Sequence, residues 1–276
     1  MDFELGARAA EKGYRLFSFE TVGSTNVEAM KAARGGEAGP AWFVSGHQSQ
    51  GRGRRGRAWQ TEPGNLAASL LLTLDHSPQR MATLGFVAGL SLSDALAVAA
   101  PDARIATALD GAAGKGNVRF ELKWPNDLIA GGAKLAGIML ESELLEGGRS
   151  ALVTGIGVNV ISAPTDVPYP ATCLRDLGSM LDAPALFRAL SDAWMENYEL
   201  WEAADGIAGV RAKWLARAAG IGGPVAVRIG ERIVRGTFES LDSDGRLLIR
   251  EAGGGEVAVA AGEVHFGAVA SVAAAD

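Results

Sequence analysis

Four arginines and three glycines stand close together in a segment that contains no acidic residue. Residues 50–59 read QGRGRRGRAW, which places Arg52, Arg54, Arg55 and Arg57 on a flexible, glycine-rich backbone. Guanidinium groups and glycine amides together suit an anionic ligand that carries phosphate or carboxylate. The segment alone is also compatible with a solvated loop or with a patch that binds nucleic acid.

Two lysines bracket a second polar cluster. In KWPNDL, which begins at Lys123, Pro125 fixes φ and leaves Asn126 and Asp127 free to direct their side chains. Lys134 follows in GGAKLAG, where small neighbours leave room for a ligand close to the backbone. Two lysines near a glycine–arginine loop would stabilise negative charge in phosphoryl or adenylyl transfer. An ordinary hairpin with surface lysines also explains this cluster when it is taken by itself.

Periodic apolar residues around these motifs predict the strands and helices that hold them in place. Thr25 and Glu28, three positions apart, are typical of a capping box at the start of a helix that Gly35 and Gly36 end. Further helices are predicted at residues 77–100 and 183–204. Predicted strands are 15–20, 41–46, 65–74, three between 119 and 144, and one within 150–162.

The last fifty or so residues have a different character. Short alternating runs, broken by DSDG and GGG turns, follow the AGIGG segment that begins at Ala219. This pattern is typical of a small five-stranded barrel. We therefore predict a domain boundary near residue 222, with a larger domain at 1–222 and a small one at 223–276.

Composition narrows the function classes. The chain has 276 residues, 48% apolar and 21% charged, as expected for a folded globular protein. Its 32 acidic and 26 basic residues give a net charge of −6, so a general attraction to nucleic acid is not expected. The arginine loop would have to act locally.

The sequence also predicts a cytoplasmic location. Cys173 is the single cysteine, which excludes an intrachain disulfide and fits a reducing compartment. The N-terminus MDFELGARAA does not resemble a signal peptide, and no membrane-spanning run is expected.

Four motifs together carry a resemblance to a known family. GRGRRGRAW, KWPNDL, AKLAGIMLE and TGIGVNV occur in the same order and with similar spacing in biotin–protein ligases. The resemblance extends from about Phe17 to the C-terminal barrel. It implies an α/β (α+β) fold like that of class II aminoacyl-tRNA synthetases, with a mixed sheet, flanking helices and a C-terminal SH3-like β-barrel. The first predicted strand begins near the N-terminus, so we expect the short form without a DNA-binding domain.

The resemblance also implies a reaction and its partners. Members of the family form biotinyl-5′-AMP from biotin and ATP with Mg²⁺, and then transfer biotin to a lysine of a biotin carboxyl carrier protein. The carrier is expected to belong to acetyl-CoA carboxylase or to a related biotin-dependent carboxylase. Neither DNA nor a membrane is an expected partner, a homodimer is possible, and no protein ligand for the metal is predicted.

Family roles transfer to matching positions of this sequence. The expected catalytic residues are Lys134, Arg54 and Lys123. The expected biotin-binding residues are Ser24, Thr25, Asn26, Gln48, Gly51, Arg52, Gly53, Arg54, Lys134 and Gly137. The expected ATP-binding residues are Arg52, Arg54, Arg55, Trp59, Lys123, Asn126, Lys134 and Asn159.

Elementary electrostatics supports these roles. A carboxylate that attacks a phosphate brings two anions together, so cations must neutralise both in the transition state. The product is a mixed anhydride that water hydrolyses, which explains a glycine-rich loop that closes as a lid.

Two alternatives remain at this stage. A lipoate or octanoate ligase would share the fold and a similar lysine, although GRGRRGR and the C-terminal barrel argue against it. A non-catalytic module that binds nucleic acid or a metabolite is disfavoured by the acidic net charge. Residues 101–118 are expected to form a surface insertion.

Overall fold

A seven-stranded mixed sheet forms the centre of the protein. The computed structural model describes residues 1–59, 61–101, 103, 119–146 and 148–266. The strand order is β1-β2-β3-β7-β6-β5-β4, with β1 and β2 parallel and the other neighbouring pairs antiparallel. The strands are β1 Arg15–Phe19, β2 Ala41–Ser45, β3 Leu66–Leu74, β4 Phe120–Lys123, β5 Asp127–Ala130, β6 Ala133–Leu144 and β7 Ser150–Val158. The predicted strands of this region are confirmed, while nearly all of the predicted 101–118 insertion lies outside the described residues.

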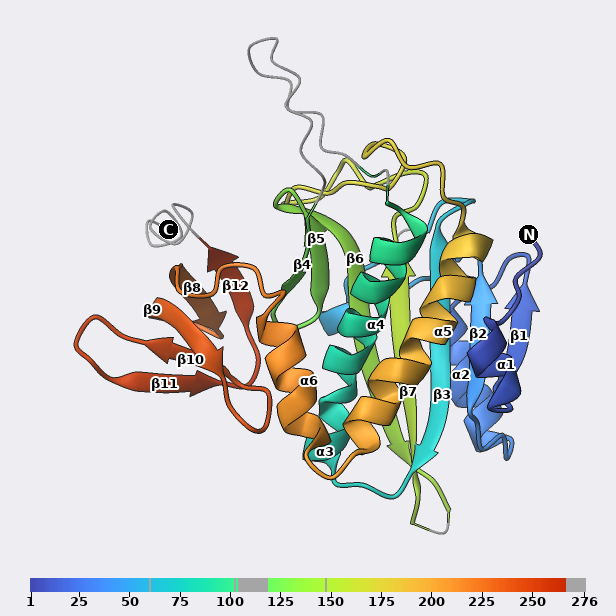
Figure 1. The fold of residues 1–276 in the computed structure, drawn as a ribbon, viewed down its shortest axis with the longest axis horizontal. Coiled ribbons are helices and arrows are strands. Elements are labelled where there is room, and N and C mark those ends of the chain that lie inside the picture. Colours follow the sequence, from blue (N-terminus) through green and yellow to red (C-terminus); the bar gives the residue numbers. More distant parts are fainter. Residues whose placement is uncertain (60, 102, 104–118, 147, 267–276) are drawn as a thin grey trace.

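Helices cover both faces of this sheet (Figure 1). On one face α4 and α5 lie side by side, and their apolar side chains form the main core with residues such as Trp42 of the sheet. On the other face α2 packs Ala29 and Ala33 against Phe43 and Val153. The helices are α1 Ala7–Glu11, α2 Thr25–Arg34, α3 Pro78–Ala82, α4 Leu84–Ala99, α5 Ala183–Glu202 and α6 Gly206–Leu215, with a 3-10 turn η1 at Arg54–Gly56.

The long helix predicted from residue 77 is divided at Thr83 into α3 and α4. The Thr83 hydroxyl donates to the carbonyl of Arg80 at 2.6 Å and accepts from the indole Nε1 of Trp201 at 2.7 Å. As predicted for the start of this helix, the Ser77 hydroxyl accepts from the backbone of Arg80. The helices α1 and α6 were not predicted, because α1 is only five residues long and α6 contains Gly206 and Gly209.

The predicted capping box at α2 is wrong. Ser24 is the N-cap residue and its side chain makes no capping hydrogen bond. The backbone N–H of Thr25 instead donates to Oε1 of Gln48, a residue that follows β2, at 2.8 Å. A side chain from elsewhere in the fold therefore satisfies a donor at the helix start, which frees the local side chains for other contacts.

Residues Pro78–Ala99 are long and apolar enough to span a membrane by length and composition alone, with a mean hydropathy of 1.6. In the fold, 67% of this apolar window is buried. The segment packs against α5, α6 and the sheet, as the core helix of a folded domain does. Its apolar character is explained by that burial.

A second, antiparallel sheet follows Gly223. Its order is β11-β10-β9-β8-β12, with strands β8 Pro224–Ile229, β9 Arg232–Leu241, β10 Leu247–Arg250, β11 Glu256–Val259 and β12 Glu263–Phe266. Five strands were predicted here and are confirmed, and the structure shows that neighbouring strands pair antiparallel. The sheet encloses its own apolar residues, including Val227, Val234 and Phe238.

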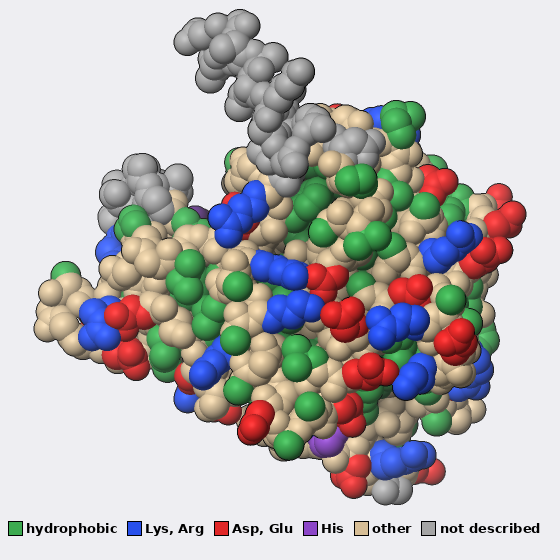
Figure 2. All heavy atoms as spheres, viewed as in Figure 1, with side chains coloured by type: hydrophobic (Ala, Val, Ile, Leu, Met, Phe, Trp, Pro, Cys, Tyr) green, Lys and Arg blue, Asp and Glu red, His purple; other side chains and the backbone are tan. Residues whose placement is uncertain are grey.

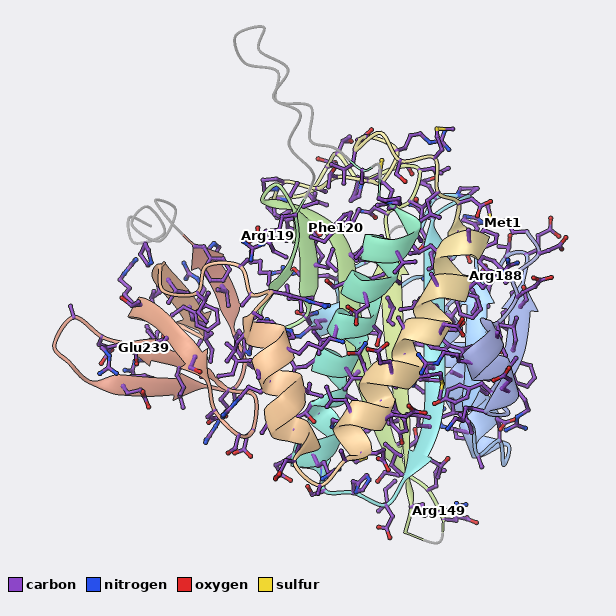
Figure 3. All side chains as sticks on the ribbon, in the orientation of Figure 1. Met1, Arg119, Phe120, Arg149, Arg188 and Glu239 are labelled. Atoms are coloured by element: carbon purple, nitrogen blue, oxygen red, sulfur yellow. The ribbon has the colours of Figure 1, made fainter. Side chains whose placement is uncertain are left out.

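The second sheet packs beside β4, the edge strand of the large sheet (Figure 1). The indole Nε1 of Trp124 donates to the carbonyl of Gly245 at 3.0 Å. Figure 3 shows the start of β4, with Arg119 and Phe120 labelled, on the side of the large sheet nearest the C-terminal strands. The polar turn after β4 is therefore held next to the second sheet.

Charged side chains of both signs are interspersed over the helical face (Figure 2). One ionic cluster joins three of its helices. Asp94 of α4 lies 2.8 Å from Lys213 Nζ of α6 and 2.6 Å from Arg217 Nη2 just beyond it, and Asn197 of α5 donates to it at 2.9 Å. Burial alone would raise the pKa of Asp94, but these hydrogen bonds together lower it below its ordinary value.

Candidate active site: a cavity between the two sheets

A cavity of about 710 Å³ opens between the large sheet, the arginine loop and the second sheet. This volume is in the range of pockets that bind small organic ligands. The residues that were predicted from the sequence and that line the cavity are Ser24, Thr25, Asn26, Gln48, Arg52, Gly53, Arg54, Trp59, Lys123, Asn126, Lys134 and Gly137.

Residues with little or no side chain form the floor of the cavity. Ala67 of β3, Gly157 of β7 and Gly137 of β6 are direct neighbours across the three strands. A Cβ atom at Gly157 would lie 2.4 Å from the indole Nε1 of Trp59, closer than non-bonded atoms approach. The indole of Trp59 therefore lies directly over the two glycines and presents an apolar surface to the cavity.

Uncharged polar side chains gather where α2 begins. Thr25 and Gln48 meet here, with Thr25 Oγ1 lying 3.0 Å from Gln48 Oε1 and Gln48 Nε2 donating to Thr61 at 3.2 Å. Asn26 lies on the sheet at Gly155, where a Cβ atom would come within 2.2 Å of the amide oxygen. Thr25 and Asn26 are both buried. This end of the cavity is therefore rich in uncharged hydrogen-bonding groups.

Lys134 lies beyond the glycine pair, close to Gly137. Its Nζ is 2.7 Å from Oδ1 of Asp127, an ionic contact without the alignment of a hydrogen bond. The same Nζ lies 5.6 Å from the centre of the Trp59 ring and 5.4 Å from that of Tyr169. Two aromatic faces and one carboxylate thus hold the ammonium group at the wall of the cavity.

The backbone of Lys134 is fixed from the other side. Its N–H donates to the carbonyl of Pro170 at 2.8 Å, and its carbonyl accepts from the N–H of Thr172 at 3.0 Å. This segment brings Tyr169 into the cavity wall. The lysine therefore projects from a strand that is paired on both edges.

Lys123, at the end of β4, adds a second cation to the same wall. Burial lowers the pKa of Lys123 most, the carboxylate of Asp127 raises it, and the nearby Lys134 lowers it, so that the net direction is downward. Its Nζ lies 5.9 Å from the ring centre of Phe266, on β12. Two ammonium groups around one carboxylate leave an excess of positive charge, which an anionic ligand would neutralise.

Arg54 joins the arginine loop to the turn after β4. Its Nη1 donates to Oδ1 of Asn126 at 2.8 Å, and Asn126 Nδ2 donates to the carbonyl of Ile138 on β6 at 2.6 Å. The backbone N–H of Ile138 donates back to the carbonyl of Asn126 at 2.8 Å. Asn126 is thus a rigid anchor for the loop in this conformation.

Two of the predicted site residues, Gly51 and Asn159, are placed differently. Gly51 packs against the carbonyl of Trp59, where a Cβ atom would lie 2.3 Å away, so it shapes the loop and is not part of the described lining. Asn159 is buried behind the wall and donates from Nδ2 to the carbonyl of Thr172 at 3.1 Å. The side chain of Arg55 lies outside the described part of the structure.

Several residues of the wall did not emerge as site residues from the sequence. Tyr169, His265 and Phe266 line the cavity, and Asp127, which the sequence placed in the turn after Pro125, pairs with Lys134. Aromatic residues far along the chain give no local signal for such a place. Among the residues that the structure describes, no three His, Cys, Asp or Glu side chains cluster as a metal site would require.

Comparisons with known proteins agree with this fold and cavity. Residues 38–159 match the Biotin/lipoate A/B protein ligase family, and residues 220–267 match the Biotin protein ligase C terminal domain. The chain is 38% identical over 254 residues to a biotin–[acetyl-CoA-carboxylase] ligase of Paracoccus denitrificans, covering 88% of this chain and 97% of the relative. It therefore belongs to the biotin protein ligase family.

Two further similarities are consistent with that assignment. A biotin–[acetyl-CoA-carboxylase] ligase of Mycobacterium tuberculosis is 34% identical, with 88% of this chain and 85% of the relative covered. The biotin protein ligase from Aquifex aeolicus in complex with biotin and ATP has the same fold, with a TM-score of 0.70 and 24% identity over 92% of this chain and 98% of that one. The expected mixed sheet with flanking helices is confirmed, as is the resemblance.

Proposed function

We propose that this protein is a biotin–protein ligase, which forms biotinyl-5′-AMP from biotin and ATP and transfers the biotinyl group to a lysine of a biotin carboxyl carrier protein. The observation that carries the proposal is the division of one cavity into a polar, uncharged end and a doubly cationic wall, with the indole of Trp59 on two glycines between them. Biotin has matching parts: a neutral cyclic urea, an apolar ring and chain, and a carboxylate.

The polar end suits the cyclic urea, because Thr25, Asn26 and Gln48 offer hydrogen-bonding groups without a charge that would need a counter-ion. The apolar indole of Trp59, which lies over Gly137 and Gly157, suits the fused rings. The carboxylate then lies toward Lys134. Ser24, Arg52 and Gly53 complete the proposed biotin site at the rim.

In the first step, an oxygen of the biotin carboxylate attacks the α-phosphorus of ATP, the bond to the bridging oxygen breaks, and pyrophosphate leaves. Lys134 neutralises the attacking carboxylate and the α-phosphate together, while Lys123 and Arg54 stabilise the phosphate charge. Mg²⁺, which accompanies ATP, would neutralise the leaving pyrophosphate. Trp59 and Asn126 border the proposed nucleotide side.

In the second step, the neutral ε-amine of the carrier lysine attacks the acyl carbon of the mixed anhydride. An amide bond forms, the amine gives up a proton, and AMP leaves. The arginine loop, anchored by Arg54 on Asn126, covers the intermediate against water in this proposal. The carrier is a protein of acetyl-CoA carboxylase or of a related carboxylase.

The organisation that we propose has a catalytic domain at 1–222 and an SH3-like domain at 223–276, with a cytoplasmic location. Support for the first part comes from the position of the second sheet, which begins at Pro224. Residues of β12 line the cavity, so the small domain contributes to the wall beside Lys123.

Exchange of labelled pyrophosphate into ATP tests the proposal, with biotin, lipoate and octanoate supplied separately. We expect exchange with biotin alone. Exchange that depends on lipoate or octanoate and not on biotin would replace the proposed substrate with that of the related ligases in the same matched family.

A further inference from the structure

Glu141 is a charged residue that lies close to the cavity and yet is not part of its described lining. It stands on β6, and its Oε2 accepts a hydrogen bond of 2.7 Å from Nδ2 of Asn26. Asn26, which is 4% exposed, does line the cavity. Glu141 can therefore act on a ligand only through its neighbours.

The carboxylate fixes the orientation of the Asn26 amide. An ionised carboxylate only accepts hydrogen bonds, so the NH₂ group of Asn26 must face Glu141 and its Oδ1 must face the other way. That oxygen lies 2.6 Å from Oγ of Ser69, a buried residue of β3. Because Oδ1 has no proton to give, the single hydroxyl proton of Ser69 points to Asn26.

This assignment continues to the cavity. Ser69 Oγ also lies 2.7 Å from Thr25 Oγ1. Since Ser69 already donates its hydroxyl proton to Asn26, the Thr25 hydroxyl must donate to Ser69. No hydroxyl proton is left between Thr25 Oγ1 and Gln48 Oε1, and at 3.0 Å theirs is the longest of the three oxygen–oxygen contacts.

We propose that Glu141 is a positioning residue that turns the lone pairs of Thr25 Oγ1 and Gln48 Oε1 toward the ligand. The two oxygens then form an acceptor pair for N–H groups. The inference rests on the proposed function, in which the cyclic urea of biotin, with two N–H groups, occupies this end. An analogue with a ring oxygen in place of one N–H would set lone pair against lone pair.

A purely mechanical role for Glu141 would be to fasten α2 to β6. Glu143 provides a matched control, because it lies two residues later on the same face of β6 and also bonds α2. The Glu143 carboxylate accepts hydrogen bonds from Arg34 at 2.5, 2.8 and 3.1 Å. Glu143 and Arg34 make no contact with the Asn26–Ser69–Thr25 hydrogen-bond chain in these bonds. If Glu141 only holds α2 against β6, substitution of either glutamate should have the same effect on ligand binding.

The test compares the dissociation constants of biotin and of its cyclic carbamate analogue by titration calorimetry. Wild type should prefer biotin by a factor on the order of 10² or more, because the carbamate leaves a buried acceptor unpaired. Glu141→Gln should lower this ratio by about tenfold, since glutamine can present either its oxygen or its NH₂ to Asn26 and no longer fixes the chain of protons. Glu143→Gln should leave the ratio unchanged.

A Glu141→Gln protein that loses affinity for both ligands in equal proportion would overturn the inference. Ser69→Ala gives a second route, because it removes the acceptor of the Thr25 proton, and it should also lower the ratio. An unchanged ratio in Ser69→Ala would overturn the inference even if Glu141→Gln did not fold. A wild-type protein that binds no biotin would instead overturn the proposed function itself.

Discussion

Two regions of the molecule each combine two cations with one carboxylate, but they differ in how these groups are hydrogen-bonded. Around Asp94, two cations and an amide donate to one carboxylate at 2.6–2.9 Å, and the pKa of that carboxylate is lowered. Around Asp127, two ammonium groups share one carboxylate, and the pKa of Lys123 is lowered. The first cluster is saturated with hydrogen bonds, whereas in the second Lys134 contacts Asp127 without a hydrogen bond and lies beside an open cavity. Hydrogen bonds that saturate a cluster support stability, and an ammonium group without such bonds at a cavity wall supports binding of an anion.

Lys134→Ala, which removes a cation of the second cluster, should have the largest effect on activity. We expect biotinyl-AMP formation to fall on the order of 10²-fold or more, because the attacking carboxylate and the α-phosphate lose their shared cation. The midpoint of urea unfolding should change little. Single-turnover adenylate synthesis measures the loss, and Lys213→Ala, in the saturated cluster, is the matched lysine control. A folded Lys134→Ala protein that works at the wild-type rate would remove this lysine from the mechanism.

Arg54→Gly should have the next largest effect, which we expect on the retention of biotinyl-AMP in the cavity. The change removes the 2.8 Å bond that joins the loop to Asn126. Biotinyl-AMP should leave the protein about tenfold faster, since one charge-assisted hydrogen bond of about 1.5 kcal/mol is lost. Biotinylation of unrelated proteins in the assay would report the leak. Unchanged specificity and unchanged retention would contradict a role of Arg54 in closing the loop.

Asp94→Asn should show the reverse pattern, a loss of stability with little loss of activity. The substitution leaves Lys213 and Arg217 partly buried without their carboxylate, and we expect a cost of about 2 kcal/mol in the free energy of unfolding. Urea unfolding provides the measurement, with adenylate synthesis at 25 °C as the control. A large loss of activity without a change in stability would refute the contrast between the two clusters.

The pH dependence of that cost follows from the lowered pKa of Asp94. A carboxyl group with a depressed pKa in the folded state contributes its full stability above the ordinary value of about 3.9. The contribution is lost as pH falls through the folded-state pKa. The difference between wild type and Asp94→Asn should therefore be constant near neutrality and shrink below about pH 4.

Individual strands and turns of this fold were predictable from sequence, because the spacing of apolar residues and the presence of turn-forming residues depend on a few neighbouring positions. The strand ending at Lys123, the turn at Pro125 and the strand that carries Lys134 follow from their own residues. The site residues that lie together in one cavity were identified through the resemblance to the family.

Contacts between distant segments could not be predicted in this way. Nothing near Asp94 in the sequence indicates Lys213, and nothing near Glu141 indicates Asn26, which lies more than a hundred residues earlier. Asn159 belongs to the TGIGVNV motif, but its side chain donates a hydrogen bond to the carbonyl of Thr172 behind the cavity wall. The direction of a side chain depends on the packing around it, which the motif does not reveal. The same is true of Phe266, whose place beside Lys123 depends on how the second sheet packs.

Lys123→Met should give the smallest effect and sharpen the comparison most finely. Because the pKa of Lys123 is lowered in the folded state, the unfolded chain binds its proton more tightly, and the charged lysine costs stability at neutral pH. That cost disappears as pH rises from the folded-state pKa toward the ordinary value of about 10.4. Methionine keeps the apolar stem without the charge, so the variant should be more stable than wild type by about 0.5 kcal/mol at pH 7. The advantage should vanish near pH 10.5, while adenylate synthesis should be reduced at both pH values. Urea unfolding at the two pH values measures the difference in stability. A variant less stable than wild type at pH 7 would show that Asp127 already compensates both lysines. The second cluster would then resemble that of Asp94, whose partners compensate its charge.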